Sequence, residues 1–510
     1  MASTLVHRLH ASVQRAPEAE AIVWQGRRTR YAELWRQSCA VAAWLRGQGL
    51  APGDRVALLL ENSPQYAAAY YGILAAGGVA VGLNTEARAR DIGHWLRHSG
   101  ATHLFASRRY PGFDALGAAC EGQARLVEVD CSGAADDDGW TRVQASNPDE
   151  PDWSLLSDPE RLAAIIYTSG TTGAPKGVMQ SHRNLDSNVA SIISYLRLAA
   201  GDSVLNVLPF YYTYGNSVLH THLASGGRVV LENSLLYPRK VLETLAAERV
   251  TGFSGVPSTY ALLLNRTRLE EFDLSSLRYM TQAGGPMPPA AIERLLEIVP
   301  HVAFYVMYGQ TEATARLTWL PPERLRDKLG SVGIAIPGVQ IEIRDEQTFE
   351  PLPAGVTGEI CARGDNITPG YWKNPEATAR VLRDGWLRTG DLAHMDEEGY
   401  IYMDGRRSDM IKSGANRIAP QEIEEVIAEM DEVAEVAVVG VPEEILGQVI
   451  KAVIVPGNGA ELEPRAVQAW CRRNLAAYKV PKFIEFVQEL PKTASGKIRR
   501  HVLQETNRGQ

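Results

Sequence analysis

The sequence predicts an α/β protein with a large N-terminal domain of several subdomains and mostly parallel sheets, followed by a small α+β domain. Short runs rich in β-branched residues alternate with amphipathic stretches of helical period through most of the chain, a pattern typical of buried parallel sheets covered by helices. The chain has 510 residues, more than one hydrophobic core usually supports. The pattern also changes near Gly405, which indicates a second domain.

Several apolar runs of the N-terminal part are short enough to be strands, and the stretches between them have the period of helices. The predicted strands are Val56–Leu60, Val79–Gly82, His103–Ala106, Ala163–Tyr167, Ser203–Leu208 and Val229–Glu232. The predicted helices include Tyr66–Ala76 and Ala290–Ile298. Since strands and helices alternate, we expect crossover connections and parallel pairing.

The small domain is predicted from a change of pattern. Before Gly405, the segment GWLRTGDLAHMDEEGYIYMDG alternates polar and apolar residues and contains turn signals such as Glu398-Gly399, as hairpins do. After it, a helix begins at Pro420 with acidic residues in its first turn, and a second helix is expected around Arg465–Leu475. We therefore expect a domain of residues 1–404 and a second of residues 405–510.

Composition excludes several classes of protein. The formal net charge of -8 disfavours a nucleic-acid or anionic-membrane partner, which would need a basic face. The five cysteines are scattered and form no CxxC pair, so neither a zinc site nor a disulfide framework is expected. No signal peptide or membrane span is predicted, and we expect a cytoplasmic location.

The segment Ala163–Leu185 carries the clearest chemical signal. A buried-strand run leads into Thr168–Lys176, which is rich in hydroxyls and glycines and ends in a lysine. Small residues let backbone amides approach phosphate oxygens, hydroxyls add donors, and Lys176 adds a positive charge. A flexible linker is the alternative, but the preceding strand and the lysine favour a nucleotide-phosphate site. The segment is not a Walker A loop, because Gly177 follows the lysine where Ser or Thr is needed.

The segment YTSGTTGAPKG resembles the phosphate-loop signature of the acyl-adenylate-forming superfamily of AMP-binding enzymes, which includes acyl-CoA synthetases, aryl-CoA ligases, adenylation domains and luciferases. Further motifs follow in the family's order: QAGGPM, MYGQTEAT, WLRTGD, GRRSDMIKSG and LPKTASGKIRR. Alone, Asp391 would be interpreted as a turn residue, Glu312 as a helix cap and Lys497 as a surface lysine. The ordered series favours the functional interpretation.

The resemblance implies a role for each matched residue. Nucleotide binding is expected at Thr168, Ser169, Gly170, Thr171, Thr172, Lys176, Gly284, Gly285, Tyr308, Gly309, Thr311, Glu312, Asp391, Arg406 and Lys497. The catalytic residues among them would be Lys497, Glu312 and Thr168. Glu312 would hold Mg²⁺, a hard cation that prefers oxygen ligands.

The implied reaction has two halves. The acid's carboxylate attacks the α-phosphorus of ATP, giving an acyl-adenylate and pyrophosphate, and a thiol then takes the acyl group. In the family, the small domain is mobile and rotates about a hinge between the halves, as in other hinge closures. The hinge matches Ser408, where many relatives carry Asp or Lys, and Gly414 would line the thiol channel. The expected cofactors are ATP, Mg²⁺ and coenzyme A, or the phosphopantetheine of a carrier protein.

The acyl pocket is expected around Leu208–His222. The substrate-binding candidates are Tyr212, Tyr214, Asn216, Gly284 and Gly309, although the tyrosines could equally be core residues. No acidic residue lies between Leu208 and His222 to pair with an ammonium, so an uncharged-tail acid is expected over an α-amino acid.

Two functions stay open at this point, and two others are disfavoured. The first is an AMP-forming acid–thiol ligase acting on a small carboxylic acid and coenzyme A. The second is a stand-alone adenylation enzyme that loads an acyl or amino acid onto a separate carrier protein. A phosphotransferase, which would form ADP in place of AMP, is disfavoured by the phosphate-loop sequence. A catalytically silent scaffold is disfavoured because the phosphate loop, Glu312 and Lys497 are all present.

Overall fold

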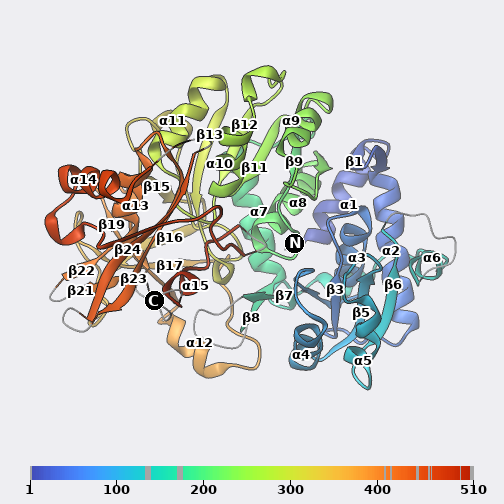
Figure 1. Cartoon of the computed structure of the whole chain (residues 1–510). Coiled ribbons are helices and arrows are strands. Elements are labelled where there is room, and N and C mark those ends of the chain that lie inside the picture. The colour runs from blue at the N-terminus through green and yellow to red at the C-terminus, as the bar shows by residue number, and fades with distance from the viewer. Residues whose placement is uncertain are drawn as a thin grey trace.

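A computed structural model of the whole chain describes residues 3–131, 139–168, 176–406, 409–413, 416–443, 447–457, 460, 462–493 and 496–505. The N-terminal part of the chain, drawn in blue, lies at one side of the molecule and the C-terminal part, drawn in red, at the other, while the N-terminal end itself lies near the centre of the view (Figure 1). Three sheets organise the described part of the chain.

The first sheet is mostly parallel and has helices packed on it. Its order is β6 (Arg125–Val129), β5 (Ala101–Ser107), β3 (Arg55–Leu59), β4 (Val79–Gly82), β7 (Leu162–Thr168) and β8 (Lys176–Ser181). Only β8 runs antiparallel to its neighbour, β7. The helices of this region are α2 (Tyr31–Gly47), α3 (Pro64–Ala75), α4 (Ala89–Ser99), α5 (Leu116–Cys120) and α6 (Gly139–Gln144). At Gly72 of α3, a Cβ atom would lie 2.6 Å from the backbone of Ser38 in α2, so the two helices pack closely.

The second sheet is half parallel and half antiparallel. Its parallel strands are β1 (Glu20–Trp24), β10 (Arg228–Leu231), β9 (Ser203–Asn206), β11 (Gly252–Gly255), β12 (Tyr279–Gln282) and β13 (Ala303–Tyr308), with β2 (Arg27–Arg30) antiparallel at the edge. Beyond β13 the order continues through β14 (Thr318–Trp319), β15 (Ser331–Ala335), β20 (Ile401–Arg406), β19 (Trp386–Met395), β17 (Gly358–Gly364) and β16 (Val339–Arg344), all antiparallel, while β18 (Leu382–Arg383) pairs with β19.

The remaining helices of the large part of the chain connect or flank these strands. They are α1 (Leu5–Arg15), α7 (His182–Leu196), α8 (Thr213–Ser225), α9 (Pro238–Ala247), α10 (Pro257–Arg266), α11 (Pro289–Ile298) and α12 (Pro375–Val381). A capping box at Ser181 and Asn184 fixes the start of α7. Short 3₁₀ turns include Thr311–Ala313, which carries part of the site described below.

The third sheet belongs to the C-terminal part alone. Its order is β22 (Asn416–Ile418), β21 (Ile411–Ser413), β24 (Gly447–Pro456) and β23 (Val433–Glu443), and β25 (Phe483–Phe486) pairs with β24. The helices α13 (Pro420–Ala428) and α14 (Pro464–Asn474) pack on one face around Ile423, Ile427 and Val467. The last helix, α15 (Arg500–Glu505), lies near β23.

The predicted fold class is confirmed. Each strand and helix predicted by range is present, with its bounds shifted by about two residues or fewer, because buried apolar runs and amphipathic stretches determine them directly. Mostly parallel pairing holds for the first sheet and for half of the second. The antiparallel half contains the hairpins expected before Gly405. The proposed boundary at Asp404–Gly405 lies within β20, and the strands of the third sheet begin at Ile411.

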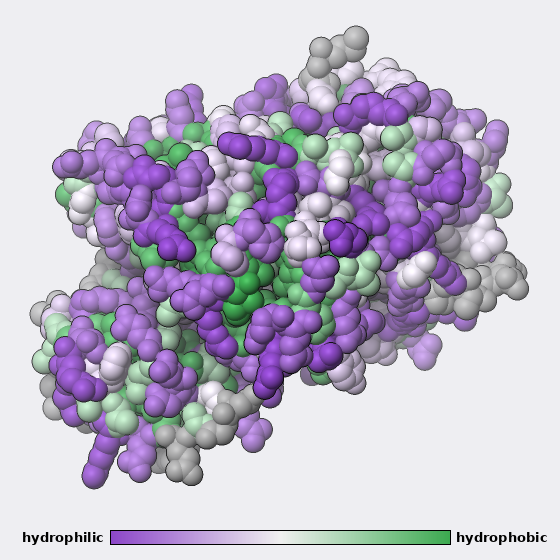
Figure 2. Space-filling model, turned by 90° about the horizontal axis from the view of Figure 1, so that it is seen from above, coloured by the Kyte–Doolittle hydropathy of each residue, from purple (hydrophilic) through white to green (hydrophobic). Residues whose placement is uncertain are grey.

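The face seen in Figure 2 is mostly hydrophilic, but it has a hollow where hydrophobic residues gather. Within the described ranges, no helix is both long enough and apolar enough to cross a bilayer. All five cysteines are buried with free thiols.

Candidate active site

The β7–β8 hairpin frames the phosphate loop. Thr168 is the last residue of β7 and lies opposite Lys176, the first residue of β8, in the antiparallel register. The loop between them, residues 169–175, lies outside the described residues, and so do the predicted ligands Ser169, Gly170, Thr171 and Thr172. Thr168 and Lys176 are therefore the described residues that flank the predicted phosphate loop on its two sides.

Tyr371 links Lys176 to Glu312, which are far apart in the sequence. The Lys176 ammonium nitrogen lies 5.0 Å from the centroid of the Tyr371 ring, a cation–π distance. The Tyr371 hydroxyl donates a hydrogen bond to Glu312 Oε1 over 2.7 Å. Burial, and then the negative charge of Glu312, raise the pKa of the Tyr371 phenol, so it stays a donor at neutral pH. The lysine and the carboxylate are thus placed on two sides of one aromatic side chain.

Backbone contacts hold Tyr371 in this position. Residues 370–372 pair with β8: Val178 forms a bridge with Tyr371, and the Trp372 amide donates to the Gly177 carbonyl over 2.7 Å. The Thr368 amide donates to the Glu312 carbonyl over 2.8 Å. The segment 368–372 therefore connects the phosphate-loop hairpin to the 3₁₀ turn of Glu312.

Glu312 is suited to hold Mg²⁺ together with substrate phosphates. Its side chain is partly exposed, and Oε1 accepts the one hydrogen bond resolved for the carboxylate. Among the residues that the structure describes, no group of three His, Cys, Asp or Glu side chains could form a metal cage. This agrees with the usual Mg²⁺ site at nucleotides, where one or two carboxylates and the phosphate oxygens supply the ligands.

Tyr308 and Asp391 form a partly buried polar pair in the candidate site. The Tyr308 hydroxyl donates to Asp391 Oδ2 over 2.6 Å, and Asp391 is 2% exposed. Tyr308 ends β13, Asp391 lies in β19, and Arg406 of β20 is the register partner of Asp391. The backbone thus brings Arg406 beside Asp391, while its side chain lies outside what the structure describes.

The loop Gly284–Gly285 and the Lys497 loop meet at one turn, Val256–Ser258. A Cβ at Gly284, where φ is +93°, would lie 3.2 Å from Val256 Cγ1. A Cβ at Gly496 would lie 2.7 Å from Ser258 Oγ and 2.8 Å from Val256 Cγ2. Both loops therefore pack against the same turn. Lys497 is the next residue after Gly496, which makes this contact.

Local bonds shape the Lys497 loop itself. Lys492 and Ile498 form a β-bridge, and the Thr493 amide donates to the Lys497 carbonyl over 2.7 Å. The Lys497 amide in turn donates to Thr493 Oγ1 over 3.1 Å. These bonds tie residues 492–493 to residues 497–498.

The acyl-pocket candidates lie at the start of α8 and behind β13. The Tyr214 hydroxyl bonds with Thr281 Oγ1 at 2.8 Å, at the end of β12, and Tyr212 caps the N-terminus of α8. Asn216 is 3% exposed, and its Oδ1 has no hydrogen-bond partner in the part of the chain that the structure describes. A Cβ at Gly309 would lie 2.1 Å from the Ala315 carbonyl oxygen, so only glycine fits there.

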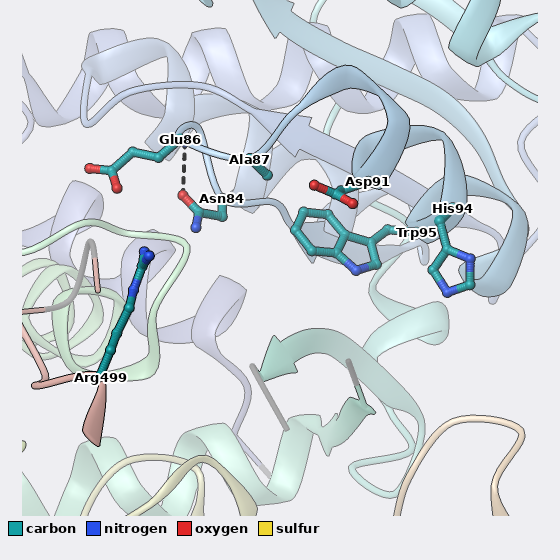
Figure 3. A pocket seen from close by; sticks show the side chains of 7 residues that line it. All are labelled: Asn84, Glu86, Ala87, Asp91, His94, Trp95 and Arg499. Atoms are coloured by element: carbon teal, nitrogen blue, oxygen red, sulfur yellow. Dashed lines mark hydrogen bonds between the residues drawn. The ribbon is translucent and has the colours of Figure 1, made fainter. Parts of the chain in front are cut away.

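A separate cavity of about 380 Å³ lies near the Lys497 loop, between it and α4. Its lining residues are Asn84, Glu86, Ala87, Asp91, His94, Trp95 and Arg499. Arg499, two residues after Lys497, faces Asn84 and Glu86 across this space (Figure 3). The C-terminal part therefore meets the first sheet's helices here as well as the Val256 turn.

The sequence interpretation missed several side chains that build this site. Tyr371, Val256 and Ser258 carry no motif, because their roles depend on segments that pair only in the folded chain. Arg316, just beyond the MYGQTEAT segment, was not a candidate either. Two predicted residues, Ser408 and Gly414, lie outside the described residues.

Comparisons with known proteins agree with this arrangement. A family model described as AMP-binding enzyme matches residues 9–372, and one described as AMP-binding enzyme C-terminal domain matches residues 422–497. The chain is 37% identical over 486 residues to a feruloyl-CoA synthase of an Amycolatopsis species, covering 95% of each chain. Among solved structures, ATP-bound MatB from Rhodopseudomonas palustris is similar with a TM-score of 0.90, 32% identity and 99% of both chains covered. The anthranilate CoA ligase AuaEII with anthranoyl-AMP gives a TM-score of 0.91 at 27% identity, covering 98% of this chain and 96% of that one.

Proposed function

The chain belongs to the AMP-binding enzyme family, and from this premise we propose how its own residues carry the reaction. It is an ATP-dependent, AMP-forming ligase that activates a carboxylic acid as an acyl-adenylate and transfers the acyl group to the thiol of coenzyme A. No general base is needed in the first half, since a carboxylic acid is already ionised at neutral pH.

In the first half, a carboxylate oxygen of the acid attacks the α-phosphorus of ATP, and the bond to the pyrophosphate oxygen breaks. Lys497 lies between the acid's carboxylate and the α-phosphate and lowers their repulsion. Thr168 and Lys176 hold the β- and γ-phosphates at the ends of the phosphate loop. Positioning and charge neutralisation of this kind account for most catalysis of phosphoryl and nucleotidyl transfer.

A second group of residues binds the nucleoside part of ATP. Asp391 accepts hydrogen bonds from the ribose hydroxyls, and Tyr308, which is bonded to that carboxylate at 2.6 Å, packs beside adenine. The Gly284–Gly285 loop lies along the other edge of the base, Thr311 binds the α-phosphate, and Gly309 allows close approach of the backbone. Arg406, beside Asp391 in the sheet register, adds a positive charge near the ribose and phosphate.

Glu312 is the residue that would hold Mg²⁺, in contact with the phosphate oxygens. Bound there, the ion neutralises phosphate charge and orients the pyrophosphate as a leaving group. The Tyr371 hydroxyl keeps the Glu312 carboxylate turned toward this position, because it is bonded to Oε1.

In the second half, the thiolate of coenzyme A attacks the acyl carbonyl, and the bond to AMP breaks. We propose that the C-terminal domain, residues 405–510, first rotates about Ser408, which removes Lys497 from the site. Gly414 would then line the channel for the pantetheine arm. A carrier protein is the alternative acceptor.

One observation carries this proposal: the Lys497 loop is seated on the turn that also supports the Gly284–Gly285 loop. The test is an assay of the purified chain with ATP, Mg²⁺, coenzyme A and a panel of carboxylic acids. We expect AMP, pyrophosphate and an acyl-CoA in equal amounts for at least one acid. ADP as the product, or pyrophosphate release without any thioester, would contradict the proposal. Thioester formation only with an added carrier protein would change the acceptor.

A further inference from the structure

Among the residues that the structure describes, Arg316 is a buried cation without a counter-ion. It is 3% exposed and lies between the 3₁₀ turn Thr311–Ala313 and β14. Arginine is almost never fully buried unless it is paired, because removing its charge from water is costly. Its position therefore needs a physical explanation.

The contrast with other buried charges is clear. Within the described ranges, Lys451 is the other cation as deeply buried, at 1% exposure, and it forms an ion pair with Glu485 at 2.5 Å. Arg388 likewise pairs with Glu359 at 2.5 Å. For Arg316, in contrast, no carboxylate of the described residues lies within ion-pair distance.

The contacts that Arg316 does make are with uncharged groups, and one of them is a side-chain hydrogen bond to Tyr195. Its central carbon lies 4.1 Å from the centroid of the Tyr214 ring, and its Nε donates to Met307 Sδ over 3.4 Å. A thioether sulfur is a weak acceptor, and a ring face offsets only part of the cost of burying a cation. The charge of Arg316 also acts on Tyr195 and Tyr214, which lowers the otherwise raised pKa of both phenols.

The position of Arg316 ties it to the acyl pocket. Tyr214, on which it stacks, begins α8 and is itself a pocket candidate. A Cβ at Gly309 would lie 2.8 Å from Arg316 Cα, so the Arg316 backbone packs directly against Gly309. The guanidinium thus lies beside Tyr214 and the Arg316 backbone lies beside Gly309, the two residues that border the expected site of the acid's tail.

We propose that Arg316 is a specificity-determining residue that donates hydrogen bonds to an oxygen acceptor on the tail of the acid substrate. The preferred acid then carries, besides its reacting carboxylate, a second oxygen group at the far end, either a carboxylate or a ring hydroxyl. An acid whose tail is only hydrocarbon would leave the guanidinium without a hydrogen-bond acceptor on the substrate and without water. This inference rests on the proposed function, because it needs the tail to lie beside Tyr214 and Gly309.

A site that hydrogen-bonds an oxygen of its substrate strongly rejects an analogue that lacks this oxygen. A hydrophobic site discriminates much less between substrates that differ by one methylene group. The test therefore uses matched pairs of acids: cinnamate against 4-hydroxycinnamate, and hexanoate against adipate. For each, kcat/KM is measured from pyrophosphate release with the full chain, ATP, Mg²⁺ and coenzyme A. We expect the oxygenated member of one pair to be preferred at least about 10-fold. The pair that responds identifies the acceptor as a hydroxyl or a carboxylate.

The variant Arg316→Met keeps the length of the side chain and removes its donors and charge. We expect it to abolish the preference by raising KM for the oxygenated acid about 10-fold or more, while the bare acid is used as well as or better than before. Arg316→Lys, which keeps the charge, should retain part of the preference. Arg239→Met, at a surface arginine with 67% side-chain exposure, is the matched control and should change nothing.

The outcomes separate the inference from the proposed function. If no acid gives pyrophosphate, the proposed function fails. If acids are activated but the bare member of both pairs is preferred, or Arg316→Met keeps the wild-type preference, the inference is wrong. Should Arg316→Met fail to fold, as judged by thermal unfolding, the wild-type comparison of the two pairs still decides.

Discussion

The carbonyl oxygen of Gly496 accepts a hydrogen bond from the Ser258 hydroxyl over 3.4 Å, which joins the Lys497 loop to the first turn of α10. The two residues are far apart in the sequence, and their contact brings the C-terminal part against the large domain. Gly496 has a φ of +77°, and a Cβ there would lie within 2.8 Å of both Ser258 Oγ and Val256 Cγ2. This contact places Lys497 next to the turn that also contacts the Gly284–Gly285 loop.

The first prediction tests this contact with Gly496→Ala. The added methyl group would push the Lys497 loop away from Val256, so acyl-adenylate formation should fall about 10-fold or more while thioester formation from a pre-made acyl-adenylate continues. Both rates are measured separately, the first by ATP–pyrophosphate exchange. Gly399→Ala is the matched control, because Gly399 has a φ of +87° but open space around its Cα. Equal effects of the two variants would show that backbone strain, and not the contact of Gly496 with Val256 and Ser258, lowers the rate of acyl-adenylate formation.

The second prediction concerns Lys497 itself. Lys497→Ala should lower ATP–pyrophosphate exchange at least about 100-fold, because it removes the positive charge placed between the acid's carboxylate and the α-phosphate. Thioester formation from a synthetic acyl-adenylate should stay near the wild-type rate, since this half does not use the lysine. Lys492→Ala, on the same hairpin and paired with Glu435, is the control. Wild-type exchange by the Lys497 variant would refute its assigned role.

The third prediction is for Tyr371→Phe. Removing the hydroxyl leaves Glu312 Oε1 without its 2.7 Å donor, and a hydrogen bond to a charged group contributes about 1.5–3 kcal/mol. We expect the Mg²⁺ concentration needed for half-maximal activity to rise about 10-fold, with activity recovering at high Mg²⁺. A Mg²⁺ titration at saturating ATP measures this. Tyr237→Phe, at an exposed tyrosine, should leave the titration unchanged.

The fourth prediction is a loss of stability in mild acid. Burial lowers the pKa of His220 to about 3 and that of His222 to about 4. An unfolded histidine titrates near 6.5, so between that value and the folded pKa the unfolded chain binds more protons. The stabilisation is therefore complete above about pH 6.5 and is lost as pH falls toward 4, at about 1.4 kcal/mol per pH unit for each such histidine.

Chemical unfolding at several pH values between about 7.5 and 5 measures this slope. His220→Gln should reduce the slope, because one of the groups that takes up a proton on unfolding is removed. The exposed His301 gives the control variant His301→Gln. A slope that is unchanged in His220→Gln would mean that His220 does not set the acid limit.

The sequence determined the fold class and most of the elements within it. Apolar runs such as Val79–Gly82 became buried parallel strands, and the amphipathic stretch Ala290–Ile298 became most of α11, because burial of apolar side chains decides both and is encoded locally. The motifs likewise determined the family, since the order of several short segments is too specific for chance. The identity of Glu312, Asp391 and Lys497 as candidates needed no tertiary information.

Only the tertiary structure decided which side chains support these candidates. The Tyr371 bond to Glu312 depends on the pairing of residues 370–372 with β8, and the seat of Gly496 depends on two domains meeting. That no described carboxylate lies near Arg316 is also a property of packing, because an acid from any part of the chain could have been its partner. Long-range contacts of this kind are fixed by how whole sheets and helices pack, and no local pattern of residues records them.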